Sequence, residues 1–272
     1  MFEQYFGMTH VPFSRDVPPN ALYESPAMSD ALGRLAYAAD RQLFAVVTSD
    51  AGCGKTTLIR KFASSLPKDD YIFLYLSDSK LTPRWFYKGL LDQLGIESRF
   101  YRGDAKRQLQ REIEIIRGVH GQRVVCVLDE AHLLEKETIE EFRFLLNYRF
   151  DSMSPMALIL VGQNELWEEK LRLRRYAAVR QRIDINCVLP RLDRSETENY
   201  IHAHLDYAGC EQEIFTSRAI DEIFRISAGT MRVVNRICEK ALMYGCQQHR
   251  HLIDNQDITF VSEHEMLKGG DA

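Results

Sequence analysis

The feature that most constrains this chain is residues 46–59, where an apolar run passes through a glycine-bearing turn into a helical segment. Val46 and Val47 are typical of a buried strand, and Gly52 and Gly54 give the following turn its flexibility. Such a turn directs successive backbone N–H groups at an anion, and the N-terminus of the next helix adds partial positive charge. The stretch therefore predicts a phosphate-binding loop.

In this loop we expect Lys55 to reach the β- and γ-phosphates of a nucleotide and the Thr56 hydroxyl to bind Mg²⁺. The motif G-x-x-x-x-G-K-[ST] places its first glycine where this chain has Ser49. A serine fits there if its φ stays negative, so we expect nucleotide binding to survive this departure. The residues expected around the phosphates are Asp50, Ala51, Gly52, Cys53, Gly54, Lys55, Thr56 and Thr57.

The length and charge of the chain limit its possible partners. At 272 residues it has room for one large and one small domain, and its net charge is −4, so a nucleic acid would have to bind a local basic patch. Its six cysteines form no C-x-x-C pair, which predicts reduced thiols. No apolar stretch approaches the roughly 18 residues of a membrane span and no leader pattern is present, so we expect a cytoplasmic protein without a membrane partner.

Apolar runs of strand length alternate with helical patterns over the first 190 residues. Strands are expected over residues 43–48, 71–76, 124–128, 156–161 and 183–189. Helices are expected over residues 28–41, 55–65, 83–94, 137–148 and 167–182, with a further helix capped by Asp104. Strands buried on both faces and joined by helices specify an α/β three-layer domain with a parallel sheet.

The strand patterns stop near residue 190. Residues 195–208, 217–227 and 231–247 predict three helices. We therefore expect an α/β nucleotide-binding domain over residues 1–190, with an aromatic-rich arm at residues 1–26 laid against the body, and a small helical lid over residues 191–272.

The expected strand 124–128 ends in two acidic residues. Asp129 is placed to hold the water shell of Mg²⁺, and Glu130 to polarise the attacking water as a general base. The long interval between Lys55 and Asp129 leaves room for an inserted strand, which argues against a Ras-like arrangement. Gln163 follows the strand 156–161 and is placed to touch the γ-phosphate or the water.

Three arginines are candidates for a second charge at the phosphates. Arg180 and Arg182 lie where a helix enters the last strand, and either one can serve a neighbouring subunit as an arginine finger. Arg232 begins a helix of the lid and can fold back over the nucleotide. For each of them the alternative is a surface salt bridge.

Together these residues resemble the AAA+ ATPases, and within them the ExeA/TniB/TnsC-like group. The resemblance covers nearly the whole chain, from Tyr5-Phe6-Gly7 to Gly229-x-x-Arg232, and the string Val161-Gly162-Gln163-Asn164-Glu165-Leu166 is its most group-specific part. It implies a P-loop ATPase of the ASCE type that uses ATP and Mg²⁺. It also implies a sensor 1 role for Gln163 or Asn164, a sensor 2 role for Arg232, and a finger at Arg182 or Arg180.

The resemblance further implies a role for the chain. A module of this length without a membrane part is similar to the transposon-encoded ATPases that select target DNA. Those relatives form homo-oligomeric rings or filaments on duplex DNA with ATP, and signal to a transposase and in some cases a target-selector protein. By this likeness the candidate DNA contacts are Lys80 and Arg84, with a second basic cluster at residues 99–107, and turnover is slow until a partner stimulates it.

Two other readings stay open at this point. One is an ExeA-like secretion or envelope-assembly ATPase, and the other is an ATP-dependent signalling switch that never binds DNA. A DEAH helicase, which Asp129-Glu130-Ala131-His132 brings to mind, is disfavoured because no second motor domain follows.

Overall fold

The computed structural model describes residues 2–78, 81–146, 154–210 and 212–266. The chain divides into two compact units. The sheet unit comprises Ala27–Asp50 and Leu58–Leu189, and the helical unit comprises Met1–Pro26, Ala51–Thr57 and Pro190–Ala272. Each unit is described below by itself.

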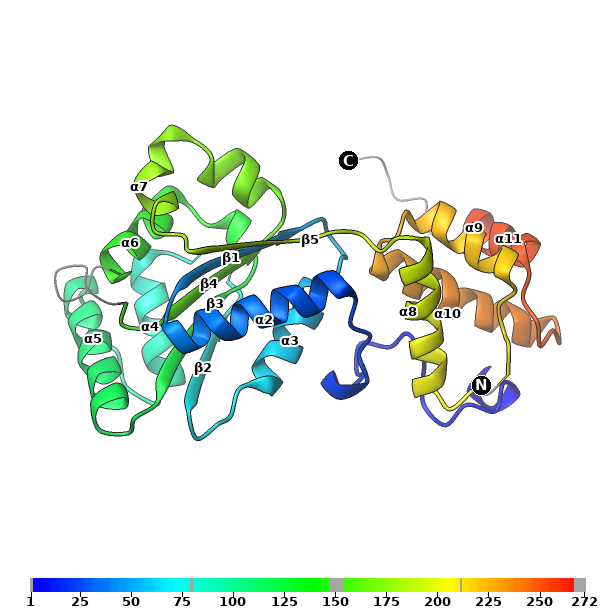
Figure 1. The fold of residues 1–272 in the computed structure, drawn as a ribbon, viewed down its shortest axis with the longest axis horizontal. Coiled ribbons are helices and arrows are strands. Elements are labelled where there is room, and N and C mark those ends of the chain that lie inside the picture. The colour runs from blue at the N-terminus through cyan, green and yellow to red at the C-terminus, as the bar shows by residue number, and fades with distance from the viewer. Residues whose placement is uncertain (1, 79–80, 147–153, 211, 267–272) are drawn as a thin grey trace. The chain divides into compact units, whose positions relative to one another are not determined.

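The sheet unit is built on five parallel strands in the order β2-β3-β4-β1-β5 (Figure 1). The apolar runs form these strands because every residue of β1 and β4 is buried, as a sheet covered on both faces requires. This confirms the predicted α/β fold with a parallel sheet. The strands are β1 (Phe44–Ser49), β2 (Tyr71–Leu76), β3 (Arg123–Leu128), β4 (Ala157–Gly162) and β5 (Ile185–Leu189).

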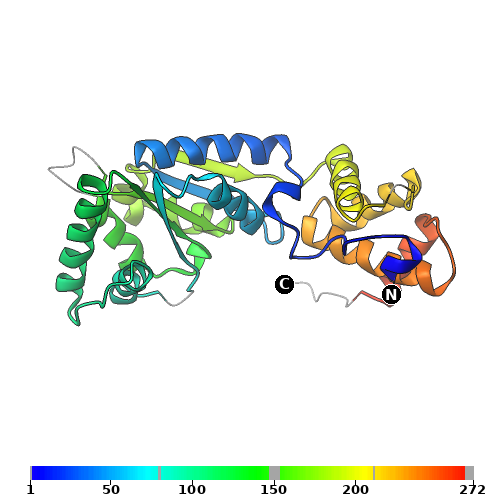
Figure 2. The same ribbon diagram turned by 90° about the horizontal axis from the view of Figure 1, so that it is seen from below.

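Helices cover both faces of the sheet, which makes the three layers. Helix α2 (Pro26–Arg41) lies on one face, whereas α4 (Pro83–Gln93) and α5 (Arg102–Gly118) lie on the other (Figure 2). Alternate strand residues such as Val124, Cys126 and Leu128 form a core with the second face's helices, including α6 (Lys136–Leu146). Helix α3 (Lys55–Ser65) has the bounds that the sequence predicted.

The sequence predicted one helix over the arginine-rich residues 167–182, and this prediction is wrong because the segment is broken into three short pieces. It contains a π-helical turn at Leu166–Leu171, a 3-10 turn at Arg174–Tyr176 and the four-residue α7 at Ala177–Arg180. The break is stabilised by the Arg180 guanidinium, which donates hydrogen bonds to the carbonyls of Leu171 (2.9 Å) and Arg172 (2.7 Å). Arg180 thereby satisfies backbone acceptors that a continuous helix would have paired.

The cap predicted at Asp104 is also wrong. Helix α5 begins at Arg102 with Tyr101 at the N-cap, and Asp104 lies in the first turn, where it pairs with Arg107. An acidic side chain in a first turn still interacts favourably with the helix dipole.

In the described part of the helical unit there are four long helices, whereas the sequence predicted three. They are α8 (Arg194–Tyr207), α9 (Ser217–Ser227), α10 (Met231–Gln247) and α11 (Asn255–His264). The last one begins with a capping box, in which the Asp254 side chain accepts from the N–H of Asp257 and the Asp257 side chain accepts from the N–H of Asp254. This Asp-x-x-Asp pattern was the available sequence signal for the missed helix.

The N-terminal arm packs within the helical unit. The ring of Tyr5 stacks on His251 with centroids 4.3 Å apart, and the N–H of Thr9 donates to the carbonyl of Ala208 at 2.8 Å. The backbone N–H of Phe13 donates to Nδ1 of the buried His204 at 3.2 Å. The arm therefore has specific polar attachments to α8 in addition to its buried aromatic side chains.

Among the described helices, none combines the length and apolar character needed to cross a membrane.

Candidate functional site

The strand order places the candidate residues of the sheet unit at one edge. β4 pairs with both β3 and β1, with Leu160 opposite Leu128 and Val46. Because the strands are parallel, their carboxyl ends meet at the same edge. Asp50, Asp129 and Gln163 are the residues that follow β1, β3 and β4, so this edge is the candidate site.

The predicted phosphate-binding loop connects β1 to α3. Gly52 and Gly54 have φ values of +82° and +89°, which L side chains rarely adopt, and Lys55 is the first residue of α3. Ser49 is the last residue of β1 and is not among the residues with positive φ, as its substitution for glycine requires. Its hydroxyl donates to the carbonyl of Asp50 at 3.0 Å. The loop has the glycine geometry and helix N-terminus that fit a nucleotide's phosphates.

Arg232 lies against this loop within the helical unit. Its backbone N–H donates to the carbonyl of Gly52 at 3.1 Å, and a Cβ on Gly52 would come within 2.9 Å of the Arg232 Cβ. Gly229 makes this approach of α10 possible, because its φ is +74° and a Cβ there would lie 1.9 Å from the carbonyl oxygen of Leu192. The Gly229-x-x-Arg232 spacing therefore has a steric basis.

Asp129 is a buried carboxylate with two aligned donors. The hydroxyl of Tyr75 donates to its Oδ2 at 2.7 Å, and the backbone N–H of Glu130 donates to its Oδ1 at 2.8 Å. Burial and the nearby Asp129 raise the pKa of Tyr75 above its usual range, so Tyr75 stays a donor at neutral pH. Each oxygen of the Asp129 carboxylate accepts one of these hydrogen bonds and keeps a second lone pair, which can accept from the water shell of Mg²⁺. A carboxylate held in place by two donors fits that role. The sequence analysis missed Tyr75, although a tyrosine one position before the end of β2 was the available signal.

Glu130 has a left-handed backbone conformation, with φ 53° and ψ 31°. Such a conformation costs a non-glycine residue about 1–2 kcal/mol, and strain of this kind concentrates at functional sites. The Oε2 of Glu130 lies 3.4 Å from Nδ1 of His132. The strained turn thus directs the glutamate toward a histidine that the sequence analysis had not assigned to the site.

His132 connects Glu130 to Gln163. The side-chain amide nitrogen of Gln163 lies 3.0 Å from Nε2 of His132, and its backbone nitrogen lies 3.4 Å from Nδ1. Nδ1 accepts the backbone N–H of Gln163, so the proton of a neutral His132 ring resides on Nε2, toward the Gln163 side-chain amide. Gly162 allows this approach, because a Cβ there would lie 3.0 Å from the backbone nitrogen of His132.

Asn164 has a different partner from Gln163. Its side-chain amide donates to Oδ1 of Asp50 at 2.6 Å. Asn164 therefore holds the first residue after β1, whereas Gln163 belongs to the Glu130 cluster. Both residues named for the sensor 1 role therefore have a side-chain partner in the sheet unit, and the choice between them stays a prediction.

The two candidate finger arginines differ in their surroundings. Arg180 donates to two carbonyls of its own segment, as described above, while Arg182 is half-buried just before β5. The candidate DNA contacts also differ, since Lys80 lies outside the described residues and Arg84 is exposed in the first turn of α4.

Two members of the second basic cluster, Arg102 and Lys106, lie against one carboxylate that was not predicted from the sequence. The buried Glu141 accepts from Lys106 at 3.0 Å and from the Tyr87 hydroxyl at 2.6 Å, and Arg102 lies 3.7 Å from it. Burial and the neighbouring Glu141 raise the pKa of Tyr87 above its usual range. These cations therefore stabilise the contact between α5 and α6.

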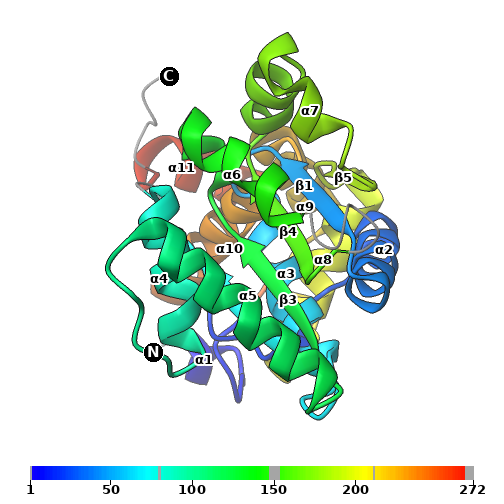
Figure 3. The ribbon, with the colours of Figure 1, turned by 90° about the vertical axis from the view of Figure 1, so that its left-hand side faces the viewer.

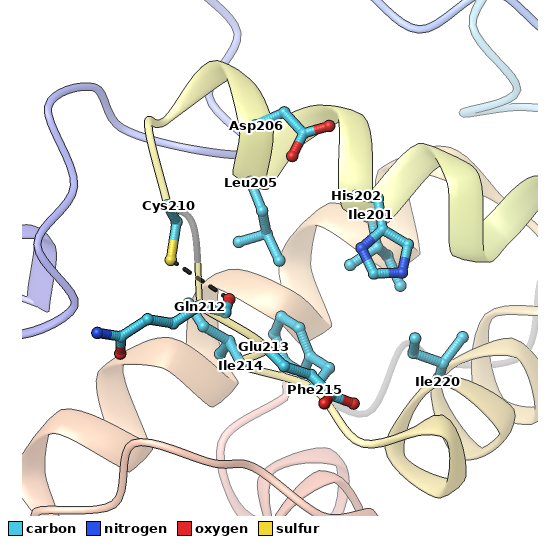
Figure 4. Close-up of a pocket in the computed structure, with 10 residues that line it drawn as sticks. All are labelled: Ile201, His202, Leu205, Asp206, Cys210, Gln212, Glu213, Ile214, Phe215 and Ile220. Carbon is cyan, nitrogen blue, oxygen red and sulfur yellow. Dashed lines mark hydrogen bonds between the residues drawn. The ribbon is translucent and has the colours of Figure 1, made fainter.

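A separate pocket of about 220 Å³ lies in the helical unit between α8 and the segment before α9 (Figure 4). Its lining includes Leu205, Ile214 and Phe215, and at its rim Cys210 Sγ lies 3.7 Å from the carbonyl of Gln212. Within the described residues, no three His, Cys, Asp or Glu side chains are grouped to hold a metal, here or elsewhere.

A parallel five-stranded sheet with a glycine loop after β1, an acidic pair after β3 and a C-terminal helical lid is the α/β P-loop fold of the AAA+ class of ATPases. The family model described as an AAA domain matches residues 38–169. The chain is similar to general secretion pathway protein A of Aeromonas hydrophila, with 32% identity over 267 residues, covering 96% of this chain and 48% of that protein. It therefore spans about half the length of this curated relative.

Two solved structures show the same fold. Cdc6p from Pyrobaculum aerophilum has a TM-score of 0.72 at 17% identity, covering 95% of this chain and 71% of that chain. The RuvB Holliday junction branch migration motor of Thermotoga maritima has a TM-score of 0.54 at 18% identity, covering 87% of this chain and 67% of that chain. At such identities these likenesses establish the fold alone.

Proposed function

We propose that this chain hydrolyses ATP, and the observation that carries the proposal is the cluster of Asp129, Glu130, His132 and Gln163 at one edge of the sheet. Glu130 accepts a proton from the attacking water as general base. Gln163 contacts the γ-phosphate or that water. Lys55 neutralises charge on the β- and γ-phosphates.

Mg²⁺ supplies charge neutralisation at the phosphates when it is bound. In this proposal Thr56 and Asp129 hold it, Asp129 through its water shell. Tyr75 fixes the Asp129 carboxylate, and the loop over residues 50–57 provides backbone donors to the phosphates.

We further propose that the ATP-bound chain forms a homo-oligomer, as a ring or a filament. Arg182 or Arg180 is the arginine supplied to a neighbouring copy's nucleotide, and Arg180 would have to release its hydrogen bonds to the carbonyls of Leu171 and Arg172 to do so. Arg232 reports the nucleotide state of the loop to α10.

The test of hydrolysis compares Glu130→Gln with Lys55→Ala and the exposed control Glu137→Gln. We expect Glu130→Gln to keep ATP binding and to lose about 10²-fold or more in turnover, since it removes the general base. Lys55→Ala is expected to lose ATP binding. Full turnover by Glu130→Gln would overturn the assignment.

For the biological role, the comparison with general secretion pathway protein A favours the secretion or envelope-assembly reading. In this reading ATP controls the assembly of the module with itself and with a protein of the same pathway. Its test is the sedimentation of the purified chain with ADP and with a non-hydrolysable ATP analogue. ATP-dependent assembly that is indifferent to added DNA supports this role, and assembly that requires DNA contradicts it.

The second candidate is an ATP-dependent regulator of transposition that binds duplex DNA and communicates with a transposase and a target-selector protein. The observation that favours it is the exposed cation Arg84 at the first turn of α4. The charge-reversal variant Arg84→Glu is expected to weaken salt-sensitive DNA binding, with Arg34→Glu on α2 as control. DNA-dependent turnover that is unchanged by Arg84→Glu contradicts this role for Arg84.

A further inference from the structure

Three large aromatic side chains are exposed beside one another on the sheet unit. Trp85 on α4 is 51% exposed, and Phe100 and Tyr101, which precede α5, are 68% and 71% exposed. The rings of Phe100 and Tyr101 lie edge to face with centroids 5.3 Å apart. Helices α4 and α5 pack together (Figure 3), and Arg84, next to Trp85 in the first turn of α4, lies over the Phe100 ring. This contact brings the three rings to one side of the sheet unit, and contiguous exposed aromatic side chains mark interaction sites.

Two cations lie on these rings. The guanidinium carbon of Arg84 is 4.3 Å from the centre of the Phe100 ring, and Nζ of Lys88 is 4.7 Å from the centre of the Trp85 ring. Among the described residues neither cation has a carboxylate within 4 Å, in contrast to Lys106 and Arg102 beside Glu141. The face formed by Arg84, Trp85, Lys88, Phe100 and Tyr101, here called the aromatic face, is thus locally positive in a chain of net charge −4.

We infer that the aromatic face binds nucleic acid whose bases are unpaired, by stacking bases on Trp85, Phe100 and Tyr101 while Arg84 and Lys88 contact phosphates. This inference rests on the proposed contact of Arg84 with nucleic acid, and it replaces the duplex of that candidate by nucleic acid whose bases are unpaired. Exposed rings interleaved with cations are the arrangement that single-strand binding uses, since every base offers a flat face and every nucleotide a phosphate.

The chemistry of the aromatic face favours this ligand over an intact duplex and over a protein. In a duplex the flat faces of the bases are already stacked, so Phe100 and Tyr101 would contact only the sugar–phosphate surface. Aromatic residues and arginine are common at the centres of protein interfaces, but lysine is depleted there, so Lys88 over the Trp85 ring is the observation that favours a nucleic acid over a protein.

The test uses Trp85 as its own reporter. The chain has two tryptophans, so Trp167→Phe leaves Trp85 as the single indole. With a non-hydrolysable ATP analogue and Mg²⁺, a single-stranded oligothymidylate of 20 nucleotides is expected to quench Trp85 fluorescence, and a duplex of equal length is not. In parallel, the fluorescence anisotropy of a labelled oligonucleotide is measured with the unsubstituted chain. This measurement of binding does not depend on the Trp167 substitution.

Matched variants test whether the rings of the aromatic face are needed for binding. Phe100→Ala with Tyr101→Ala is expected to weaken single-strand binding about tenfold or more. The control is Tyr37→Ala on α2, a ring that is 55% exposed and carries the Arg41 guanidinium 5.9 Å from its centre. This control is expected to change binding by less than about twofold.

Each other outcome overturns the inference in a recognisable way. Equal binding of single strand and duplex without quenching leaves the DNA-binding candidate standing and removes base stacking. Absence of binding to either nucleic acid, in a chain that still hydrolyses ATP, removes both. Loss of self-association in the Phe100 and Tyr101 variants without loss of nucleic-acid binding assigns the aromatic face to an interface between copies.

Discussion

The backbone N–H of Arg232 donates a hydrogen bond to the carbonyl of Gly52 at 3.1 Å, which joins the start of α10 to the phosphate-binding loop. The contact leaves no room for a side chain at position 52. A Cβ there would lie 2.9 Å from the Arg232 Cβ and 3.1 Å from Cγ2 of Thr230. The loop and α10 therefore constrain each other's positions through this one glycine.

We accordingly predict that Gly52→Ala weakens ATP binding at least tenfold. The φ of +82° alone costs an L residue about 1–2 kcal/mol, and the steric contact with Arg232 adds to it. Titration with a fluorescent ATP analogue measures the effect. The control is Gly33→Ala on α2, where an added Cβ meets nothing within 4 Å. Equal affinity in the two variants would show that the loop can rearrange without cost.

Ser49→Gly is expected to have the opposite outcome and to leave ATP binding intact. Ser49 has no positive φ, so the position does not require glycine, and the lost hydroxyl contact to the Asp50 carbonyl is local. Because glycine loses more backbone entropy on folding, the variant is expected to unfold with about 1 kcal/mol less stability. The same nucleotide titration together with urea unfolding checks both parts, and a large loss of ATP affinity would contradict this view of the turn.

Tyr75→Phe is predicted to raise the Mg²⁺ concentration needed for half-maximal ATPase activity about threefold to tenfold. The substitution removes the 2.7 Å hydrogen bond to Oδ2 of Asp129, and one such bond contributes about 1 kcal/mol. Tyr71→Phe on the same strand is the control, because among the described residues the Tyr71 hydroxyl accepts a hydrogen bond from Arg123, at 3.5 Å, whereas it is the Tyr75 hydroxyl that contacts Asp129. An unchanged Mg²⁺ requirement in Tyr75→Phe would show that the carboxylate is positioned without this donor.

His132→Ala is expected to lower turnover about tenfold while ATP affinity stays within about twofold. The substitution removes the ring between Glu130 and Gln163, so Glu130 is held less precisely, and loss of orientation reduces turnover without reducing binding. Single-turnover hydrolysis and nucleotide titration separate the two effects. His120→Ala at the end of α5 serves as control. Parallel losses of turnover and affinity in His132→Ala would instead indicate a general structural role.

Much of the sheet unit was predictable from sequence because its signals are local. The apolar run at Tyr71–Leu76 and the helix at Lys55–Ser65 have the predicted bounds, since buried parallel strands and the helix after a phosphate-binding loop carry strong patterns. The segment before β5 was mispredicted because its conformation depends on a side chain. Arg180 pairs with carbonyls eight and nine residues away, and no helical periodicity encodes that contact.

The candidate site was predictable where one residue type at one position carries the chemistry, as for Lys55, Asp129 and Glu130. Their assigned roles stay predictions. Tyr75 and His132 were missed because their importance arises from strand pairing. Tyr75 lies opposite Val127, which brings its hydroxyl to Asp129, and this register is not visible before the order of the strands is known.

The buried histidine of α8 that accepts a hydrogen bond from the N-terminal arm gives a prediction about pH. Burial lowers the pKa of His204 from 6.5 to about 4, and its neutral Nδ1 accepts from the N–H of Phe13, whose ring stacks on it. Above pH 6.5 His204 is neutral in the folded and unfolded chain, so its contribution to stability is complete. As the pH falls from 6.5 to 4 the unfolded chain takes up the proton first, and the free energy of unfolding decreases, by about 2 kcal/mol at pH 5.

Urea unfolding at pH 7.5 and pH 5.0, followed by circular dichroism, gives the free energy of unfolding at each pH and so tests how protonation of His204 affects it. Other groups titrate over the same interval, so the quantity compared is the loss of stability between the two pH values in each variant. We expect this loss to be about 2 kcal/mol smaller in His204→Gln, whose amide oxygen can still accept from Phe13 but does not titrate. His202→Gln, at an exposed position of the same helix, is expected to keep the original pH dependence. If His204→Gln keeps it too, then protonation of His204 is not the source of the loss of stability at low pH.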